Sequence, residues 1–377
     1  MTKYKFDEIA INSTQKKKPT EEDKVYYIGL EHIDPGCFDV VRWGSNVAPT
    51  GDKLLMQKGD VLFGKRRAYQ RKVAIAPFDG IFSAHGMVLR PNLKVIDANY
   101  FPFFISSDKF METAVRISVG GLSPTINWKD LARQEFELPS LDEQKVLADK
   151  LWAAYRLKEA YKKLLVATDE MVKSQFIEMF ENVESYCKLE DLVSDTFPGE
   201  WGSEPISENA IKVIRTTNFT NEGYLDLTDV VTRDIEPKKV VRKKLKQGDT
   251  ILERSGGTKD NPVGRVVFFD EIGDYLPNNF TQVLRPKESV NPVYLFYALY
   301  NSYNLNKAAM RAMASQTTGI QNLSMSDFMA KFIVLPSRNE QNKFEQIYRQ
   351  ADKSKSVIQK ALVYLNDIQS DELGKIA

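Results

Sequence analysis

Cysteine and histidine are scarce in this sequence of 377 residues, and long apolar runs are missing. There are two cysteines, Cys37 and Cys187, and two histidines, His32 and His85. So few thiols exclude a disulfide framework and favour a reducing compartment, and Cys and His never cluster as in a zinc site. No apolar stretch approaches the roughly 18 residues that span a bilayer, and the N-terminus lacks an apolar signal-peptide core. These absences predict a globular, cytoplasmic protein with no membrane partner.

Catalytic motifs are also missing. Residues 256–259, "GGTK", lack the first glycine and the spacing of a phosphate-binding loop, and no G-x-G-x-x-G follows a strand. The Asn/Asp-Pro-Pro-aromatic motif of adenine methyltransferases is absent too. A Cys37–His85 nucleophilic pair is conceivable, but an ordinary core or surface histidine is the better interpretation. The sequence therefore predicts a chain that is not an enzyme and has no catalytic residue, metal or cofactor of its own.

An ordered internal duplication is the strongest feature that the sequence does contain. The first copy has "LLMQKGDVLF" at 54–63, then Arg90-Pro91, Gly121-Leu122 and "LPSLDEQ" at 138–144. The second copy has "KKLKQGDTIL" at 243–252, then Arg285-Pro286, Gly319-Ile320 and "LPSRNEQ" at 335–341. A duplication predicts two similar domains about a pseudo-two-fold axis. Such symmetry suits duplex DNA, whose half-sites mirror protein symmetry.

Each half reads as a strand-rich part followed by one long helix, which predicts a mixed α/β (α+β) fold. Short β-rich runs broken by Gly, Pro and Asp indicate half-buried strands. In the first half they are 25–30, 60–63, 73–76, 80–83 and 87–89, with helices over 98–106 and 108–118. In the second half they are 212–215, 249–253, 265–269 and 282–284, with helices over 292–301 and 303–313.

The two long helices carry a heptad pattern, with apolar residues alternating by four and three. The first seam is Leu147, Leu151, Ala154, Lys158, Tyr161, Leu165, Thr168, Val172, Gln175 and Met179. The second is Phe344, Ile347, Ala351, Ser354, Ile358, Ala361, Leu365 and Ile368. The pattern favours a long antiparallel two-helix coiled coil that separates the two globular domains. The alternative is two surface helices, each packed on its own domain.

Two basic runs flank the repeated Gly-Asp strand although the net charge is only +1. They are "GKRRAYQRK" at 64–72 and "KKVVRKKLK" at 238–246. Each alone is compatible with a solvated surface patch. Each run flanks the corresponding strand of its copy. This placement and the polar residues near the runs favour DNA contact, because Arg and Lys neutralise phosphates while Arg, Gln, Asn and Ser read base edges. The predicted DNA-binding residues are Lys65, Arg66, Arg67, Tyr69, Gln70, Arg71, Lys72, Arg254, Ser255, Lys259, Asn261 and Arg265.

Two loops between the basic runs and the long helices, 119–125 and 315–321, allow two interpretations. They could bring backbone N–H groups close to phosphate, or they are only tight turns. Taken together, the duplicated motifs resemble the specificity (S) subunits of type I restriction–modification systems, over essentially the whole chain. The resemblance implies target recognition domains at 1–138 and 184–335, with spacer helices at 139–183 and 336–377.

The resemblance also implies a function and partners. Each recognition domain would read one half of a bipartite, asymmetric site in double-stranded DNA. Methyltransferase (modification) subunits would bring S-adenosylmethionine and adenine-N6 methylation, and restriction (translocase and nuclease) subunits would bring ATP-driven translocation and cleavage. A single-chain nuclease or methyltransferase is disfavoured because the catalytic motifs are missing. A pseudo-dimeric coiled-coil adaptor that does not bind DNA is disfavoured by the basic loops.

Overall fold

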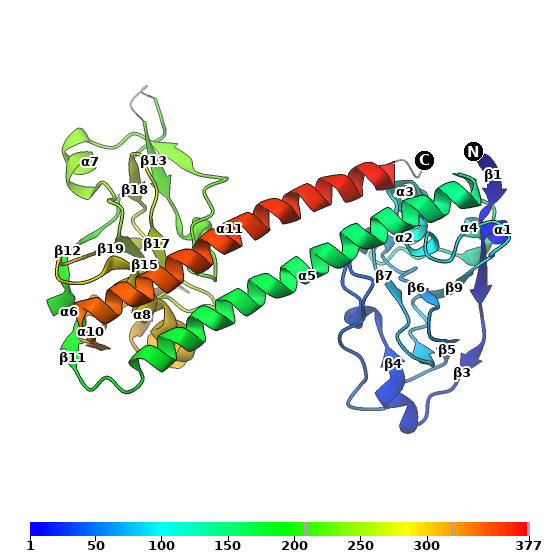
Figure 1. The fold of residues 1–377 in the computed structure, drawn as a ribbon, viewed down its shortest axis with the longest axis horizontal. Helices are drawn as coiled ribbons and strands as arrows, with labels where there is room; N and C mark the ends of the chain where they lie inside the picture. The colour runs from blue at the N-terminus through cyan, green and yellow to red at the C-terminus, as the bar shows by residue number, and fades with distance from the viewer. Residues whose placement is uncertain (207–209, 318–319, 375–377) are drawn as a thin grey trace. The chain divides into compact units, whose positions relative to one another are not determined.

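A computed structural model describes residues 1–206, 210–317 and 320–374 (Figure 1). The chain divides into two compact units. Unit 1 comprises Met1–Lys163 and Ile358–Ala377, and unit 2 comprises Leu164–Val357. The long helices α5 (Leu141–Phe180) and α11 (Arg338–Gly374) each contribute to both units. Within the described ranges, no helix combines the length and the apolar character needed to cross a lipid bilayer.

Unit 1 contains two four-stranded sheets and a two-stranded one. Its strands are β1 (Thr2–Lys5), β2 (Ala10–Ser13), β3 (Lys16–Lys17), β4 (Tyr27–Ile28), β5 (Lys53–Met56), β6 (Val61–Phe63), β7 (Val73–Ile75), β8 (Gly80–Phe82), β9 (Met87–Pro91) and β10 (Glu135–Leu138). The sheet orders are β2-β9-β6-β7, β3-β5-β8-β4 and β1-β10. Strands β4 and β8 are parallel, whereas the other pairs are antiparallel.

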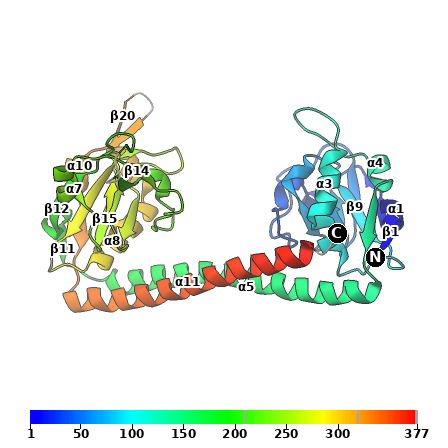
Figure 2. The same ribbon diagram turned by 90° about the horizontal axis from the view of Figure 1, so that it is seen from above.

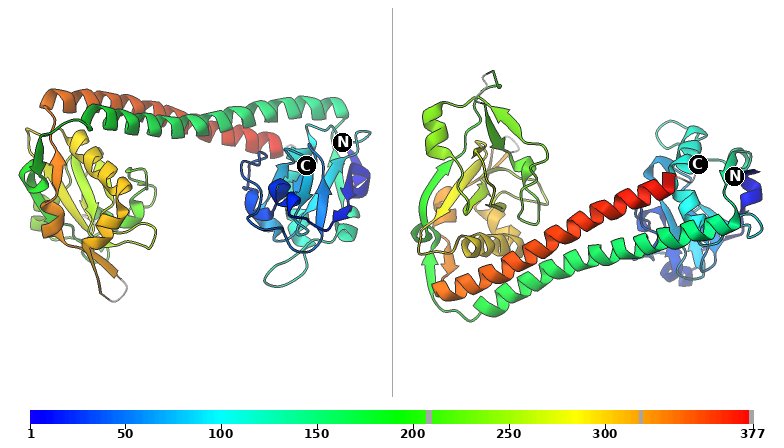
Figure 3. Two further views of the ribbon diagram at one scale, coloured as in Figure 1. Left: turned by 90° about the horizontal axis from the view of Figure 1, so that it is seen from below. Right: turned by 45° about the horizontal axis from the view of Figure 1, so that its top comes forward.

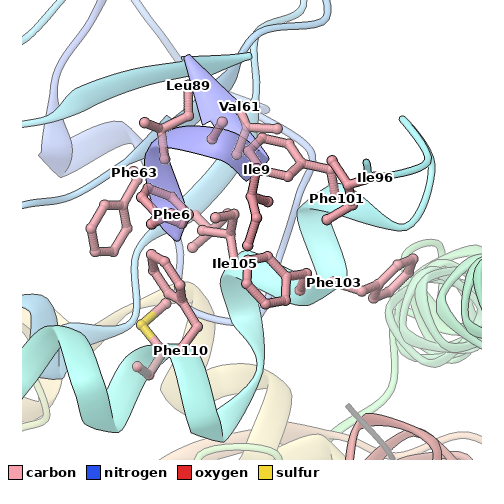
Figure 4. Packing of buried hydrophobic residues seen from close by; sticks show 14 of the residues in the cluster. Phe6, Ile9, Val61, Phe63, Leu89, Ile96, Phe101, Phe103, Ile105 and Phe110 are labelled. Atoms are coloured by element: carbon pink, nitrogen blue, oxygen red, sulfur yellow. The ribbon is translucent and has the colours of Figure 1, made fainter. Parts of the chain in front are cut away.

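Helices cover the first sheet of unit 1 and close its main core. They are α1 (Phe6–Ile9), α2 (Phe101–Ser106), α3 (Asp108–Arg116) and α4 (Trp128–Ala132), with 3-10 turns η1 (Glu22–Tyr26), η2 (Leu30–His32) and η3 (Ala68–Gln70). Ser107 begins α3 by accepting the Phe110 N–H on its side chain. Figure 4 shows Phe6 of α1 and Phe110 of α3 beside Phe63 of β6, all within one aromatic-rich core.

Unit 2 repeats the main sheet of unit 1 and adds elements of its own. Its strands are β11 (Tyr186–Lys188), β12 (Val193–Pro198), β13 (Ile211–Ile214), β14 (Val231–Arg233), β15 (Asp249–Glu253), β16 (Ser255–Gly256), β17 (Val266–Phe269), β18 (Tyr275–Pro277), β19 (Thr281–Pro286), β20 (Ala314–Thr317), β21 (Ile320–Leu323) and β22 (Phe332–Val334). The sheet β12-β19-β15-β17 matches β2-β9-β6-β7, and the parallel pair β13–β18 matches β4–β8. The other described elements are α6 (Leu189–Leu192), η4 (Thr216–Asn218), α7 (Pro237–Lys243), α8 (Pro292–Leu305), α9 (Lys307–Ala312) and α10 (Met325–Met329).

The predicted elements are largely observed, with local shifts. Strand β15 has the predicted limits, and α2 and α3 fall within the predicted helices. The predicted strand at 25–30 is wrong at its start, because η1 ends at Tyr26 and only Tyr27–Ile28 pair with β8. The predicted break before Tyr303 is also misplaced. Helix α8 continues to Leu305, because the Asn306 side chain caps α9 instead.

The Asp of the repeated Gly-Asp motif and the Arg of the repeated Arg-Pro motif form the same ion pair in both units. We call this ion pair the latch. Gly59 and Gly248 have φ values of +91° and +93°, a left-handed turn that favours glycine. In unit 1, Arg90 donates two hydrogen bonds to the carboxylate of Asp60, at 2.7 and 2.9 Å. Asp60 is buried, and it also accepts the Gln57 N–H at 2.7 Å. The carboxylate therefore ties the turn before β6 to β9.

Unit 2 has the same arrangement around Asp249. Arg285 donates to its two carboxylate oxygens at 2.8 and 2.7 Å, and the Lys246 N–H donates to it at 2.8 Å. The hydrogen bond to Asp249, opposed by burial, raises the pKa of Arg285. The duplicated motif thus stabilises the central strand pair β15–β19, which explains its presence in both halves without any contact to a ligand.

The repeated Glu-Gln motif begins each long helix and attaches it to its globular body. Glu143 accepts hydrogen bonds from the backbone and hydroxyl of Ser140, a capping box at the start of α5. The buried Gln144 side chain accepts the Asp97 N–H at 2.8 Å and donates to the Pro139 carbonyl at 2.9 Å. Ser337, Glu340 and Gln341 repeat these bonds at the start of α11, with the Asn291 N–H as the second link.

Helices α5 and α11 run antiparallel, and within each unit they lie side by side (Figure 3). In unit 1, Lys150 of α5 lies 4.0 Å from Glu372 of α11, whereas in unit 2 Asp169 of α5 pairs with Lys355 at 2.6 Å. Positions that ascend along α5 therefore meet positions that descend along α11. The expected antiparallel pairing is confirmed.

The heptad seams face inward with one exception. Every predicted seam residue of α5 is buried or half-buried, and so is every seam residue of α11 except Ser354. Ser354 is exposed, and its hydroxyl donates a hydrogen bond to the Gln350 carbonyl one turn earlier in the helix. Lys355 is buried in its place, because Asp169 and Tyr224 both contact its ammonium group. The apolar pattern of α11 could not predict that Lys355 is buried instead of Ser354. The reason lies in Asp169 and Tyr224, which are distant in the sequence.

Candidate nucleic-acid interface

Three loops of unit 1 converge around the basic run that follows β6. They are the basic loop 64–72, the turn 83–86 between β8 and β9, and the glycine loop 119–125 between α3 and α4. The basic loop leaves the sheet from a closed stem, in which the Gly64 N–H donates to the Lys72 carbonyl at 2.9 Å. Its apex is therefore displayed by a rigid sheet, an arrangement typical of binding loops.

Backbone hydrogen bonds join these loops to one another. The Arg66 N–H donates to the His85 carbonyl at 3.1 Å, and the Arg67 N–H donates to the Pro124 carbonyl at 2.8 Å. The Arg67 side chain also donates to the Ser123 hydroxyl at 3.1 Å. Arg66 and Arg67 thus occupy the junction of all three loops. The sequence alone could not predict that these three loops meet, because they are far apart in the chain. Pairing of β8 and β9 with neighbouring strands brings them together.

The backbone around this junction is strained. Arg67 and Arg71 have φ values of +55° and +53°, a left-handed conformation that costs a non-glycine residue free energy on the order of 1–3 kcal/mol. The 3-10 turn between them is anchored by Ala68, which is buried in the core. Left-handed non-glycine residues often mark functional sites, and here two arginines flank the turn in this conformation.

The seven predicted residues of the basic loop differ in exposure and in the groups that they contact. Arg66 and Arg67 lie at the loop junction, and Tyr69 is exposed beside them in the turn η3 with the half-buried Gln70. Arg71 and Lys72 bond to groups outside the three loops. Arg71 pairs with Asp108 at 2.7 Å and donates to the Ser106 carbonyl. Lys72 donates to the Leu30 carbonyl at 2.6 Å, and Lys65 is half-buried.

Further positive charge gathers near His85, which the sequence did not indicate as a binding residue. Its ring lies 3.3 Å from the guanidinium of Arg66. Burial, followed by the positive charges of Arg66, Lys65 and Lys53, lowers the pKa of His85, while Glu31 opposes them. Burial and the charge of Lys16 likewise lower the pKa of Lys65. Lys16 and Lys53 come from the neighbouring strands β3 and β5, so only strand pairing could have identified them.

Protonation of His85 gives a test of this electropositive site. A phosphate near Arg66 would raise the lowered pKa of His85, so the complex would bind more protons than the free protein. We expect DNA affinity to rise several-fold as the pH falls from about 8 to about 6. Titrations of DNA binding at each pH would measure this. His85→Gln should flatten the profile, whereas an equal slope in His85→Gln would contradict the assignment.

The corresponding loops of unit 2 differ in length and chemistry. Their stem is the same, since the Glu253 N–H donates to the Arg265 carbonyl at 2.8 Å and Arg265 occupies the place of Lys72. Arg265 is turned inward and pairs with the buried carboxylate of Glu253 at 2.7 Å. Ser255 is also buried, and donates to Asn322 of β21 at 2.7 Å. Both contacts order the loop.

The predicted cations of unit 2 lie with others that the sequence did not indicate. Arg254 donates to the Asn279 carbonyl at 3.3 Å, and Lys259 is exposed. Asn261 accepts a hydrogen bond from Lys307 at 2.8 Å, and Arg311 donates to the Lys259 carbonyl at 2.7 Å. Lys307 and Arg311 belong to α9. The hairpin β20–β21 stands out from unit 2 beside this loop (Figure 2). Thr318 and Gly319 of the predicted glycine motif lie outside the described residues.

The basic run 238–246 has a different surrounding from the basic loop of unit 1. It forms α7 and the segment after it. Lys239 and Lys243 pair with Glu200, and Lys244 contacts Asp274. Hydrogen bonding to Lys243, opposed by burial, lowers the pKa of Glu200. Much of the positive charge of this run is therefore matched by nearby carboxylates.

Comparison with known proteins decides the family. The family described as "Type I restriction modification DNA specificity domain" matches residues 3–165 and 196–362. The chain belongs to this family. The two matched segments are the two halves of the duplication, and each contains one set of converging loops. The resemblance inferred from the duplicated motifs is confirmed, and the adaptor alternative is not favoured.

Members of the specificity-domain family from enteric bacteria are similar along most of the chain. The EcoKI specificity subunit of Escherichia coli (strain K12) is 21% identical over 389 residues, covering 94% of this chain and 82% of that protein. The StySPI specificity subunit of Salmonella potsdam is 21% identical over 388 residues, with the same coverage. The fold resembles the crystal structure of the type I S subunit from M. genitalium. Its TM-score is 0.64 at 15% identity, over 100% of this chain and 95% of that one.

Proposed function

We propose that this chain is the DNA-recognition subunit of a type I restriction–modification complex that reads a bipartite, asymmetric site. Membership of the specificity-domain family supports DNA recognition as the activity. The observation that carries the proposal is a contrast between the two units. The latches at Asp60 and Asp249 are the same, whereas the loops on the stems Gly64–Lys72 and Glu253–Arg265 differ. A common scaffold with unlike loops suits two unlike half-sites.

In this proposal the recognition domains are residues 1–138 and 184–335, and the segments 139–183 and 336–377 are the spacer. Arg66, Arg67 and Tyr69 contact DNA from the first domain, with Lys65 and Gln70 beside them. Arg254, Lys259 and Asn261 do so from the second. Lys72, Ser255 and Arg265 are not exposed, and they support the loops through hydrogen bonds to Leu30, Asn322 and Glu253. Arg71 is exposed and contacts DNA beside its ion pair with Asp108.

The chain supplies specificity and no chemistry of its own. Modification subunits bind it, bring S-adenosylmethionine and methylate adenine at N6. Restriction subunits bring ATP-driven translocation and cleavage. Since the DNA that is methylated is that of the host cell, the complex acts in the cytoplasm.

Exchange of one recognition domain tests this assignment. Replacing residues 1–138 by the equivalent domain of a relative should change one half of the methylated motif and leave the other half and the spacer unchanged. Methylated adenines would be mapped in cells with the native chain, the exchanged chain and no chain. A motif that changes in both halves, or adenine methylation that persists without the chain, would contradict the proposal.

A further inference from the structure

The glycine loop of unit 1 presents a fully exposed apolar side chain at its tip. Leu122 is 98% exposed. It follows Gly120, which has a φ of +116°, and Gly121, around which a side chain would meet only open space. Single exposed leucines are common on protein surfaces and need no explanation by themselves. The surroundings of Leu122 are what distinguish it.

The base of this loop is fixed although its tip is open. The Val119 N–H donates to the Thr125 carbonyl at 3.0 Å, and the Thr125 N–H donates back at 2.9 Å. Thr125 also pairs with Arg66 in an antiparallel bridge, and the neighbouring Ser123 accepts a hydrogen bond from Arg67. Leu122 is therefore held beside the two arginines at the loop junction. The apolar tip of the loop therefore lies next to two guanidinium groups that attract phosphate.

Unit 2 carries an apolar residue at the equivalent place. Ile320 begins β21, and it is 43% exposed. Strand β21 pairs with β16, which directly follows Arg254, just as Thr125 pairs with Arg66 in unit 1. The sequence around Gly121-Leu122 and Gly319-Ile320 is compatible with tight turns or with phosphate-binding loops. Their exposed apolar residues point to a different role, because a turn requires the glycine but not a large apolar neighbour.

We propose that Leu122 is an apolar wedge that inserts between stacked base pairs of the half-site read by unit 1. This inference rests on the proposed function. Leucine is among the side chains that unstack base steps when a neighbouring basic surface holds the backbone. Arg66 and Arg67, which join the base of the loop, hold the neighbouring phosphates, and insertion removes the Leu122 side chain from water. A flexible pyrimidine–purine step is the favoured target, so Leu122 adds specificity through the deformability of DNA.

Fluorescence of 2-aminopurine tests the wedge directly. The full chain, purified with its modification subunit, would be bound to duplexes that carry the mapped target site. In these duplexes 2-aminopurine replaces one base at a time in the first half-site, outside the methylated adenine. The native complex should raise the fluorescence at one step, which reports local unstacking. Leu122→Ala should abolish that rise and weaken binding about tenfold, or about 1.4 kcal/mol.

Two further variants make the result specific. Leu122→Phe should keep the fluorescence rise, because an aromatic wedge also separates bases. Leu93→Ala removes another exposed leucine of unit 1 and should behave as the native chain. Specific binding with the same fluorescence and affinity in Leu122→Ala as in the native chain would overturn the wedge alone. A native complex that does not bind the target site would overturn the proposed function as well as the wedge.

Discussion

Replacing Arg285 by alanine is expected to destabilise unit 2 by about 3–5 kcal/mol, because it leaves a buried carboxylate without its cation. Asp249 is 1% exposed and receives both of its charged hydrogen bonds from Arg285. Urea titrations followed by hydrogen exchange at the amides of β15 and β19 would measure the loss. Exchange is needed because a chain with two units does not necessarily unfold in one step.

Matched variants separate the latch from a general effect of lost charge. Arg254→Ala also removes an arginine from the end of β15, but its guanidinium makes one long hydrogen bond to a carbonyl and is not buried. It should change the free energy of unfolding by less than about 0.5 kcal/mol. Combining Arg285→Met with Asp249→Asn removes the unpaired charge and should recover part of the stability. Equal losses in Arg285→Ala and Arg254→Ala would show that the latch is not important.

Replacing Arg66 and Arg67 together by alanine is expected to lower the affinity for target DNA about a hundredfold, or about 2.7 kcal/mol. Both arginines lie where the three loops of unit 1 meet, and Arg67 is held there in a left-handed conformation. If both neutralise phosphates, the slope of log affinity against log salt should fall by about two. Dissociation constants at several salt concentrations would measure both quantities, with the modification subunit present.

A control with the same change in net charge is available in unit 1. Lys94 and Arg133 are exposed, and neither belongs to the converging loops. Replacing both by alanine removes two positive charges and should leave affinity within a few-fold of the native value. Unchanged affinity in the Arg66 and Arg67 variant would exclude this face of unit 1 as the DNA-binding surface.

The sequence predicted the architecture because its main determinants are local or repeated. Short β-rich runs between turn residues gave strands such as β15, although β15 is buried along its whole length and not half-buried as predicted. The heptad pattern gave the seam of α5, and the duplicated motifs located equivalent turns in the two halves. Residues whose role depends on distant partners could not be placed in this way. Arg265 reads as a free cation, but it is engaged by Glu253 on the opposite side of its loop. Likewise, Lys355 is buried only because Asp169 and Tyr224 surround it.

The candidate site follows the same distinction. A run of basic residues identified the loop after β6, since charge is visible in any sequence. Which of these cations face outward depends on local backbone conformation and on acceptors such as Asp108 and the Leu30 carbonyl. Lys16, Lys53 and His85 join the site through strand pairing alone.

The loops Gly64–Lys72 and Glu253–Arg265 are each closed by a backbone hydrogen bond at their ends, which makes these ends suitable points for loop exchange. In each unit one backbone hydrogen bond, Gly64 to Lys72 or Glu253 to Arg265, separates the sheet from a loop whose length differs between the units. The sheet already accommodates both lengths on the same framework. A loop cut at these residues could therefore be transplanted from one member of the family to another, provided that it brings a side chain to fill the core position of Ala68 or Val263. New target sequences could then arise from short insertions or recombination within a single loop, and the same junctions offer a route to engineered specificity.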